Sequence, residues 1–238
     1  MALLAASVTL NIYLFNTSQQ YYLQLNGVRL DPLGTGLFAG EAGRVARPET
    51  EGDLIVFFGD SRAAAWPMPS IAGFEAVNLG VGSQTSAQII QRYEAQVAPL
   101  RPEVLVVQMC INDLKTIPLF PQLETQIIRQ CQENLAQLVT EAREQGTTVV
   151  LTTIFPVGEF PLERRLYWSE AIPQSIDEVN GFIHSLAGEG VVVFDAFAIL
   201  ADENGRLAAP YRLDELHLNP AGYEALNREF VEVLQSLQ

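Results

Sequence analysis

The sequence has few cysteines, few histidines and few basic residues. Its 238 residues include 2 cysteines and 2 histidines, and 14 basic side chains stand against 28 acidic ones, giving a net charge of −14. Two cysteines cannot form a disulfide scaffold, and no CxxC or Cys/His cluster indicates a zinc site. An acidic chain does not displace counterions from phosphate, which argues against a nucleic-acid partner. Because 48% of the residues are hydrophobic, the chain can bury a full core and is not intrinsically disordered.

The N-terminal segment 1–15 is almost entirely apolar, and Arg29 is the only charged residue before Asp31. The segment is shorter than the roughly 20 residues that span a bilayer, and it lacks the positive flank and cleavage site of a signal peptide. Three interpretations stay open: a signal-anchor that continues upstream, a degenerate signal, or an apolar helix packed on the domain. Membrane anchoring or export is favoured, with a cytoplasmic location as the alternative. Residues 16–52 have no sustained period and are predicted to be a tether.

Residues 53–238 are predicted to form one α/β domain. Short apolar runs predict strands at residues 53–58, 75–80, 103–109, 147–155 and 190–197. Helical spacing predicts helices at residues 86–97, 122–145, 171–187 and from Pro220 to the C-terminus. The alternation of strand and helix predicts a three-layer α/β/α sandwich around a mainly parallel five-stranded sheet.

Polar residues follow the predicted strands at the edge where open parallel sheets bind ligands. Ser61 follows the first strand and can act as a nucleophile if a histidine reaches its hydroxyl. His184 lies within a predicted helix, whereas His217 lies in a loop three residues after Asp214, close enough for this acid to orient the imidazole. Asn112 follows the third strand and could supply an oxyanion donor. The alternatives are a helix-capping role for the stretch around His217 and a simple turn at Asn112.

Four sequence blocks resemble the SGNH/GDSL hydrolase superfamily in content and order: FFGDSRA, VNLGVGSQTS, QMCINDLK and DELHLNPAGY. The resemblance covers about residues 53 to 235 and implies a flavodoxin-like fold. It also implies that Ser61 is the nucleophile, that Asp214 and His217 complete a triad, and that the oxyanion hole consists of Ser61, Ser83 and Asn112.

Ser83 and Cys110 depart from the family pattern, because both occupy positions where the family has glycine. Ser83 retains the main-chain N–H that donates to an oxyanion, provided that its backbone tolerates the conformation. Cys110 is interpreted as a small buried side chain, and a disulfide with Cys131 is left open.

The resemblance implies a serine esterase, similar to lysophospholipases, that acts on a small-molecule, lipid or glycan ester through an acyl-enzyme. No metal, nucleotide or flavin cofactor is expected. Gly82, Trp66 and Trp168 are candidate residues of the substrate pocket, and segment 157–169, with Arg164 and Arg165, is a candidate lid. Two alternatives remain: a membrane-tethered O-acyltransferase or deacetylase acting on envelope polysaccharide, and a silent binding module if Ser83 and Cys110 distort the oxyanion site.

Overall fold

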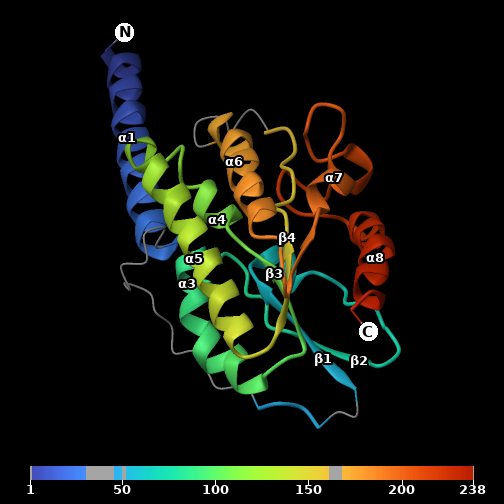
Figure 1. Cartoon of the computed structure of the whole chain (residues 1–238). Coiled ribbons are helices and arrows are strands. Elements are labelled where there is room, and N and C mark those ends of the chain that lie inside the picture. Colours follow the sequence, from blue (N-terminus) through green and yellow to red (C-terminus); the bar gives the residue numbers. More distant parts are fainter. Residues whose placement is uncertain (1, 31–45, 50–51, 161–167, 238) are drawn as a thin grey trace.

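A five-stranded sheet forms the centre of the computed structural model, which describes residues 2–30, 46–49, 52–160 and 168–237. Every neighbouring pair of strands is parallel, in the order β2-β1-β3-β4-β5 (Figure 1). The five predicted strands and the α/β class are therefore confirmed. The strands are β1 (Asp53–Gly59), β2 (Phe74–Asn78), β3 (Val104–Gln108), β4 (Thr148–Thr152) and β5 (Val191–Phe194).

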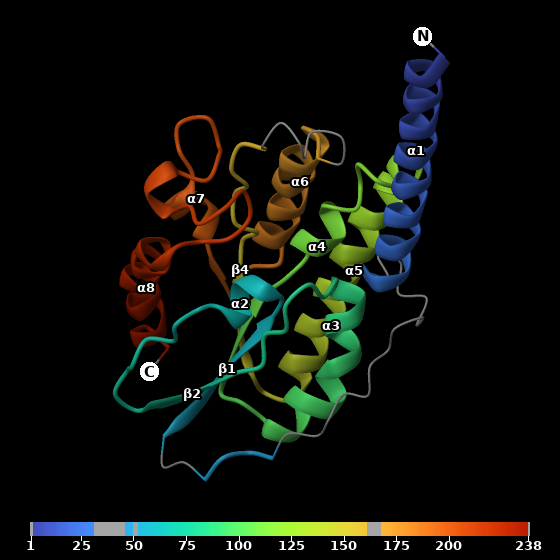
Figure 2. The same cartoon turned by 180° about the vertical axis from the view of Figure 1, so that it is seen from behind.

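Both faces of the sheet are buried, which explains why its strands are apolar rather than alternating. Successive residues of a strand point to opposite faces, so Leu54 and Val56 of β1 join one core cluster while Ile55 and Phe57 join the other. Figures 1 and 2 show helices on either side of the sheet. The first face is covered by α3 (Ser86–Arg92), α5 (Glu124–Glu144) and α6 (Ala171–Ser185), and the second by α7 (Ala196–Leu200) and α8 (Pro220–Gln235).

Helices α5, α6 and α8 lie within three residues of their predicted bounds, whereas the helix predicted at residues 86–97 is α-helical to Arg92 and continues as a π-helix over Tyr93–Val97. The side chain of Asn219 accepts a hydrogen bond from the N–H of Gly222 and caps α8, whose first residue is Pro220. Helix α5 ends just before Gly146, whose φ of +82° is a conformation that glycine adopts without strain. The short helices α2 (Ser61–Ala64) and α4 (Ile111–Leu114), like α7, were not predicted, since so few residues show no helical period.

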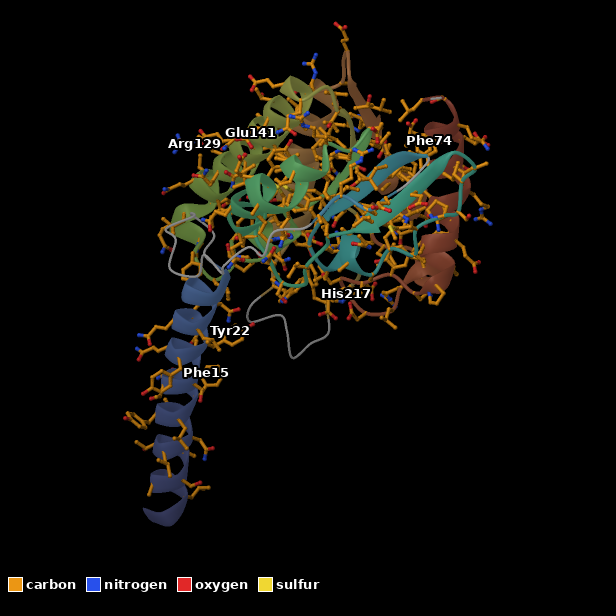
Figure 3. The ribbon with its side chains drawn as sticks, turned by 90° about the horizontal axis from the view of Figure 1, so that it is seen from below. Phe15, Tyr22, Phe74, Arg129, Glu141 and His217 are labelled. Carbon is orange, nitrogen blue, oxygen red and sulfur yellow. A yellow bond between two sulfur atoms is a disulfide. The ribbon has the colours of Figure 1, made fainter. Side chains whose placement is uncertain are left out.

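The N-terminal helix α1 (Ala2–Leu30) is longer than the predicted apolar segment. All three overall views show its N-terminal part projecting from the body of the protein (Figures 1, 2 and 3). Apolar side chains are exposed along it: Leu4 is 65% exposed, Ile12 57% and Phe15 50%. The interpretation of a helix packed on the domain is therefore wrong. Among the described helices, none is both long enough and apolar enough to cross a bilayer.

The predicted tether, residues 16–52, needs correction at two places. Residues 16–30 belong to α1, because the chain has no glycine or proline before Gly27 to end the helix. Residues 31–45 and 50–51 lie outside the described part. Arg47 is fixed to the domain: its guanidinium donates to the carbonyls of Leu100 and Arg101 at 2.7 and 2.6 Å and pairs with the Glu103 carboxylate at 3.0 Å.

Candidate active site

Ser61 lies at a tight turn between strand β1 and helix α2. It is the first residue of α2, directly after β1 and Asp60. A Cβ atom on Gly59 would lie 1.8 Å from the carbonyl oxygen of Gln108 on β3, and a Cβ on Gly80 would lie 2.3 Å from the backbone nitrogen of Ala64. Only glycine at these positions allows the sheet, α2 and the loop after β2 to approach so closely.

Asp60 holds the start of α2 from within the protein. Its Oδ1 accepts a hydrogen bond from the N–H of Arg62 at 2.8 Å, which makes it the N-cap residue. The carboxylate is fully buried, and this desolvation raises the pKa of Asp60 to about 6 even though the neighbouring Arg62 charge acts in the opposite direction. Asp60 therefore shapes the turn that presents Ser61.

The structure brings Ser61, His217 and Asp214 together, although the serine and the histidine are 156 residues apart. The Ser61 hydroxyl lies 3.2 Å from Nε2 of His217, and Nδ1 of the same ring lies 2.9 Å from Oδ2 of Asp214. Nδ1 is thus placed to donate to the carboxylate, which leaves Nε2 free to accept a proton from the hydroxyl.

Asp214 also stabilises the loop that carries it and His217. Its Oδ1 accepts hydrogen bonds from the N–H groups of Leu216 at 2.8 Å and His217 at 2.7 Å. Partial burial by itself would raise the pKa of Asp214, but the hydrogen bonds from the His217 side chain and these two N–H groups outweigh it and lower the pKa. The carboxylate therefore stays ionised next to the imidazole.

Two loops carry the predicted oxyanion donors, and the loop after β2 approaches Ser61 closely. In the loop after β2, a Cβ on Gly82 would lie 3.8 Å from the Cβ of Ser61. Ser83 has a φ of +67°, and among the described residues no hydrogen bond occupies its N–H. Asn112 is buried and donates one amide hydrogen to the carbonyl of Gln84 at 2.8 Å, which leaves its second amide hydrogen for a ligand. The first N–H groups of a helix, here that of Ser61, also have no partner within the helix.

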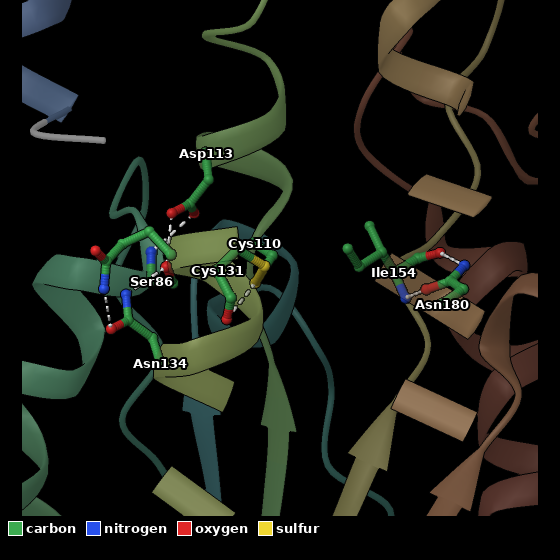
Figure 4. The surroundings of a disulfide bond; sticks show 8 residues. Ser86, Cys110, Asp113, Cys131, Asn134, Ile154 and Asn180 are labelled. Atoms are coloured by element: carbon green, nitrogen blue, oxygen red, sulfur yellow. Dashed lines mark hydrogen bonds between the residues drawn. A yellow bond between two sulfur atoms is a disulfide. The ribbon is translucent and has the colours of Figure 1, made fainter. Parts of the chain in front are cut away.

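A disulfide fixes the loop that holds Asn112. Cys110 and Cys131 are fully buried and bonded to each other, with their Cα atoms 5.8 Å apart (Figure 4). The prediction that Cys110 is a small buried side chain is confirmed, and the disulfide with Cys131, left open in the sequence, is present. Cys110 has a φ of +85°, so both positions where glycine was expected adopt a backbone conformation that favours glycine.

A buried carboxylate fixes the same loop on the other side of Asn112. Asp113 accepts hydrogen bonds from the N–H of Ser86 at 2.8 Å and from its hydroxyl at 2.6 Å, and Asn134 donates to that hydroxyl at 2.9 Å (Figure 4). Desolvation raises the pKa of Asp113 to about 7, against the lowering effect of the bonds from Ser86. The network joins α3, α4 and α5 behind the Asn112 amide.

Sequence reasoning missed the role of Arg62. This side chain is completely buried and donates to the carbonyls of Leu216 at 3.0 Å, Phe155 at 2.9 Å and Pro156 at 3.3 Å. It therefore connects the helix of Ser61 directly to the loop of Asp214 and His217. In the sequence, only its position next to Ser61 could have indicated this role, because the carbonyl groups that it binds belong to distant segments.

The remaining candidate residues lie in different parts of the protein. Trp66 is 2% exposed and packs in the core with the rings of Phe57, Phe155 and Phe230, so its assignment to a pocket is wrong. Trp168 lines a cavity, discussed below, together with Phe160. Arg164 and Arg165 lie outside the described residues. His184 lies 3.7 Å from Asp195 on the surface and takes no part in the site.

Solved structures with the same fold support this assignment of the architecture. A GDSL-like lipase from Bacteroides thetaiotaomicron is 22% identical, with a TM-score of 0.65 over 82% of this chain and 93% of that one. A variant of an acetyl-xylooligosaccharide esterase from Geobacillus stearothermophilus is 19% identical, with a TM-score of 0.60 over 81% of this chain and 95% of that one.

A comparison with curated proteins gives no match. The family model of the GDSL-like lipases and acylhydrolases, in contrast, matches residues 50–225, a region that includes all four sequence blocks described above. Because this match covers most of the chain, the protein belongs to the GDSL-like lipase/acylhydrolase family and is a hydrolase that acts on esters.

Proposed function

We propose that this protein is a serine esterase that cleaves short-chain carboxylic esters through an acyl-enzyme, with Ser61 as nucleophile, His217 as general base and Asp214 as its orienting acid. The observation that supports this most directly is the continuous chain of contacts from the Ser61 hydroxyl through both nitrogens of His217 to Asp214. Nucleophile, base and orienting group within hydrogen-bond reach are the signature of nucleophilic catalysis.

In the first half of the reaction, His217 removes the hydroxyl proton while Ser61 attacks the ester carbonyl. The N–H groups of Ser61 and Ser83 and the amide of Asn112 stabilise the oxyanion that forms. As the bond between the carbonyl carbon and the alkoxy oxygen breaks, His217 gives its proton to the departing alcohol. In the second half, His217 takes a proton from water as the water attacks the acyl-enzyme, and it returns a proton to the Ser61 oxygen as the acid leaves.

The surroundings of the triad favour a short acyl group. The hollow that Asp214 lines has a volume of about 300 Å³, and its other walls are Glu159, Phe160, Arg212 and Glu215. Burying a methylene group yields about 0.8 kcal/mol only when the group leaves water for apolar surroundings. Charged walls do not provide such surroundings, so a long acyl chain gains little by entering this hollow, which is left to the alcohol part of the substrate. We therefore assign acetyl and similarly small acyl groups.

Labelling with a fluorophosphonate probe tests the proposal. Wild-type protein should be labelled on Ser61, and Ser61→Ala should not be labelled, because the probe reacts only with an activated serine. Ser185→Ala, which removes an exposed serine of α6, is the matched control and should be labelled like the wild type. Among nitrophenyl esters, kcat/KM should be highest for the two- to four-carbon acyl groups, following the short-acyl argument above. An unlabelled wild type would instead favour the silent binding module.

Replacing Asn112 by alanine should lower kcat about 100-fold with little change in KM, because the oxyanion develops only in the transition state. Steady-state kinetics on nitrophenyl acetate measure both quantities. Asn227→Ala is the control: the Asn227 side chain bonds Trp66 and Pro67, away from the triad, so its loss should lower stability without this drop in kcat. An Asn112→Ala protein with wild-type kcat would remove Asn112 from the oxyanion site.

A further inference from the structure

A cavity of about 800 Å³ lies next to the triad loop. Its walls come from the segment after β4, from the start of α6 and from the loop after α7, all at the end of the sheet where the strands finish (Figure 1). Three residues, Glu159, Phe160 and Arg212, also line the smaller hollow that Asp214 lines, so the two spaces are adjacent. Asp214 is the triad residue that lines the hollow, so the cavity lies next to the loop that carries Asp214 and His217.

One wall of the cavity is aromatic. The ring centroids of Phe160 and Trp168 lie 5.0 Å apart, and both rings pack against the core. The Arg206 guanidinium lies 5.5 Å from the Phe160 centroid and forms an ion pair with Glu170. The backbone is held as well, since Leu207 donates its N–H to the carbonyl of Val157 at 3.0 Å. The described walls thus form a fixed surface rather than an adaptable one.

The other walls alternate hydrogen-bond acceptors and donors. Glu159 and Asp202 offer carboxylate oxygens, Asn204 offers both groups, and Arg212 offers guanidinium N–H groups. Among the described residues, no hydrogen bond or ion pair occupies the Arg212 guanidinium, which lies over Gly158 between the cavity and the triad loop. This guanidinium is available to a ligand that passes from Ser61 into the cavity.

The walls fit a ring that has C–H groups on its faces and hydroxyls around its edge. An aliphatic chain would offer no hydrogen-bond partner to these exposed carboxylates and guanidinium groups, and it would displace the water that solvates them. An anion is also disfavoured, because carboxylates outnumber guanidinium groups around the cavity. A sugar ring places its faces on Phe160 and Trp168 and its hydroxyls, each both donor and acceptor, on the polar walls.

We propose that this cavity binds the alcohol part of the substrate and that this alcohol is a carbohydrate, an inference that rests on the proposed esterase function. The scissile ester lies at Ser61, and the sugar ring extends past Arg212 to the aromatic wall. On cleavage, the sugar hydroxyl leaves with the proton supplied by His217, and the acyl group stays on Ser61 until water releases it.

Two acetate esters with different alcohols test the inference. Wild-type kcat/KM should be at least about tenfold higher for glucose 6-acetate than for butyl acetate, since only the sugar satisfies the polar walls. Trp168→Ala and Arg212→Gln should each reduce this preference about tenfold or more. Arg129→Gln, a change in an exposed arginine of α5 (Figure 3), is the matched control and should retain the preference. Equal or better cleavage of butyl acetate would overturn the inference.

A binding measurement separates failure of the inference from failure of the proposed function. Calorimetric titration of glucose 6-acetate into Ser61→Ala should detect binding that is lost when Trp168→Ala is added. If the wild type cleaves nitrophenyl acetate but Ser61→Ala binds no glucose 6-acetate, the inference fails and the function stands. If the wild type cleaves no ester and yet this binding depends on Trp168, the cavity assignment stands and the function fails.

Discussion

Replacing Asp214 by asparagine should lower kcat on nitrophenyl acetate by about 10⁴-fold while leaving the protein folded. The reason lies in the two N–H groups, of Leu216 and His217, that donate to Oδ1 of Asp214. An asparagine oxygen would keep those two bonds, which turns its NH₂ group toward Nδ1 of His217. The ring would then accept at Nδ1 and carry its proton on Nε2, where it cannot take the proton of Ser61.

The second histidine–aspartate pair of the protein supplies the control. Asp195 caps α7 through the N–H of Ala198 and lies 3.7 Å from His184, far along the chain from Ser61. Asp195→Asn makes the same chemical change in a similar setting and should leave kcat at the wild-type value. Thermal unfolding of Asp214→Asn should stay close to that of the wild type. An Asp214→Asn enzyme with a large part of its activity retained would show that His217 is oriented by another group.

Removing the disulfide by the double substitution Cys110→Ala and Cys131→Ala should lower the free energy of unfolding by about 3 kcal/mol. The bond closes a loop with a sequence separation of 21 residues and joins the end of β3 to α5. Without it, the unfolded chain gains the freedom that loop closure removes. Urea unfolding of protein folded under oxidising conditions measures the loss, and equal stability of the two proteins would contradict it.

A second double variant separates the disulfide from the backbone conformation of Cys110. Alanine at position 110 keeps the strain of a φ of +85°, whereas glycine does not. The protein with Cys110→Gly and Cys131→Ala should therefore be more stable than the double-alanine protein by about 1 kcal/mol. If both variants are equally unstable, the positive φ at position 110 costs nothing, and the disulfide alone explains the loss.

The sheet and the order of its elements were predictable because local patterns determine them. Each strand is a short apolar run, and the polar blocks that follow β1 and β3 lie where parallel strands end, so Ser61 and Asn112 could be expected at one edge. No local sequence pattern, however, indicates that Ser61 and His217 lie within hydrogen-bond distance of each other. This prediction depended on the assumption that the fold brings the two blocks together, which the structure satisfies.

Features that depend on contacts between distant segments could not be predicted. Trp66 and Trp168 look alike in the sequence, but one lies in the core of α8 and the sheet while the other lines a cavity. The partners of Arg62 come from segments about 90 and 154 residues away, and nothing near it in the sequence indicates them. The pairing of Cys110 with Cys131 likewise required the position of α5 relative to β3.

The close main-chain contacts at Gly59 and Gly80 limit which amino-acid substitutions this enzyme can accept during evolution. Any side chain at either position would collide with main-chain atoms of β3 or α2, so the turn that presents Ser61 cannot be adjusted in small steps. Phe160, Trp168 and Arg206 at the cavity wall, in contrast, interact through their side chains. Descendants of this chain can therefore replace these side chains while keeping the same turn at Ser61.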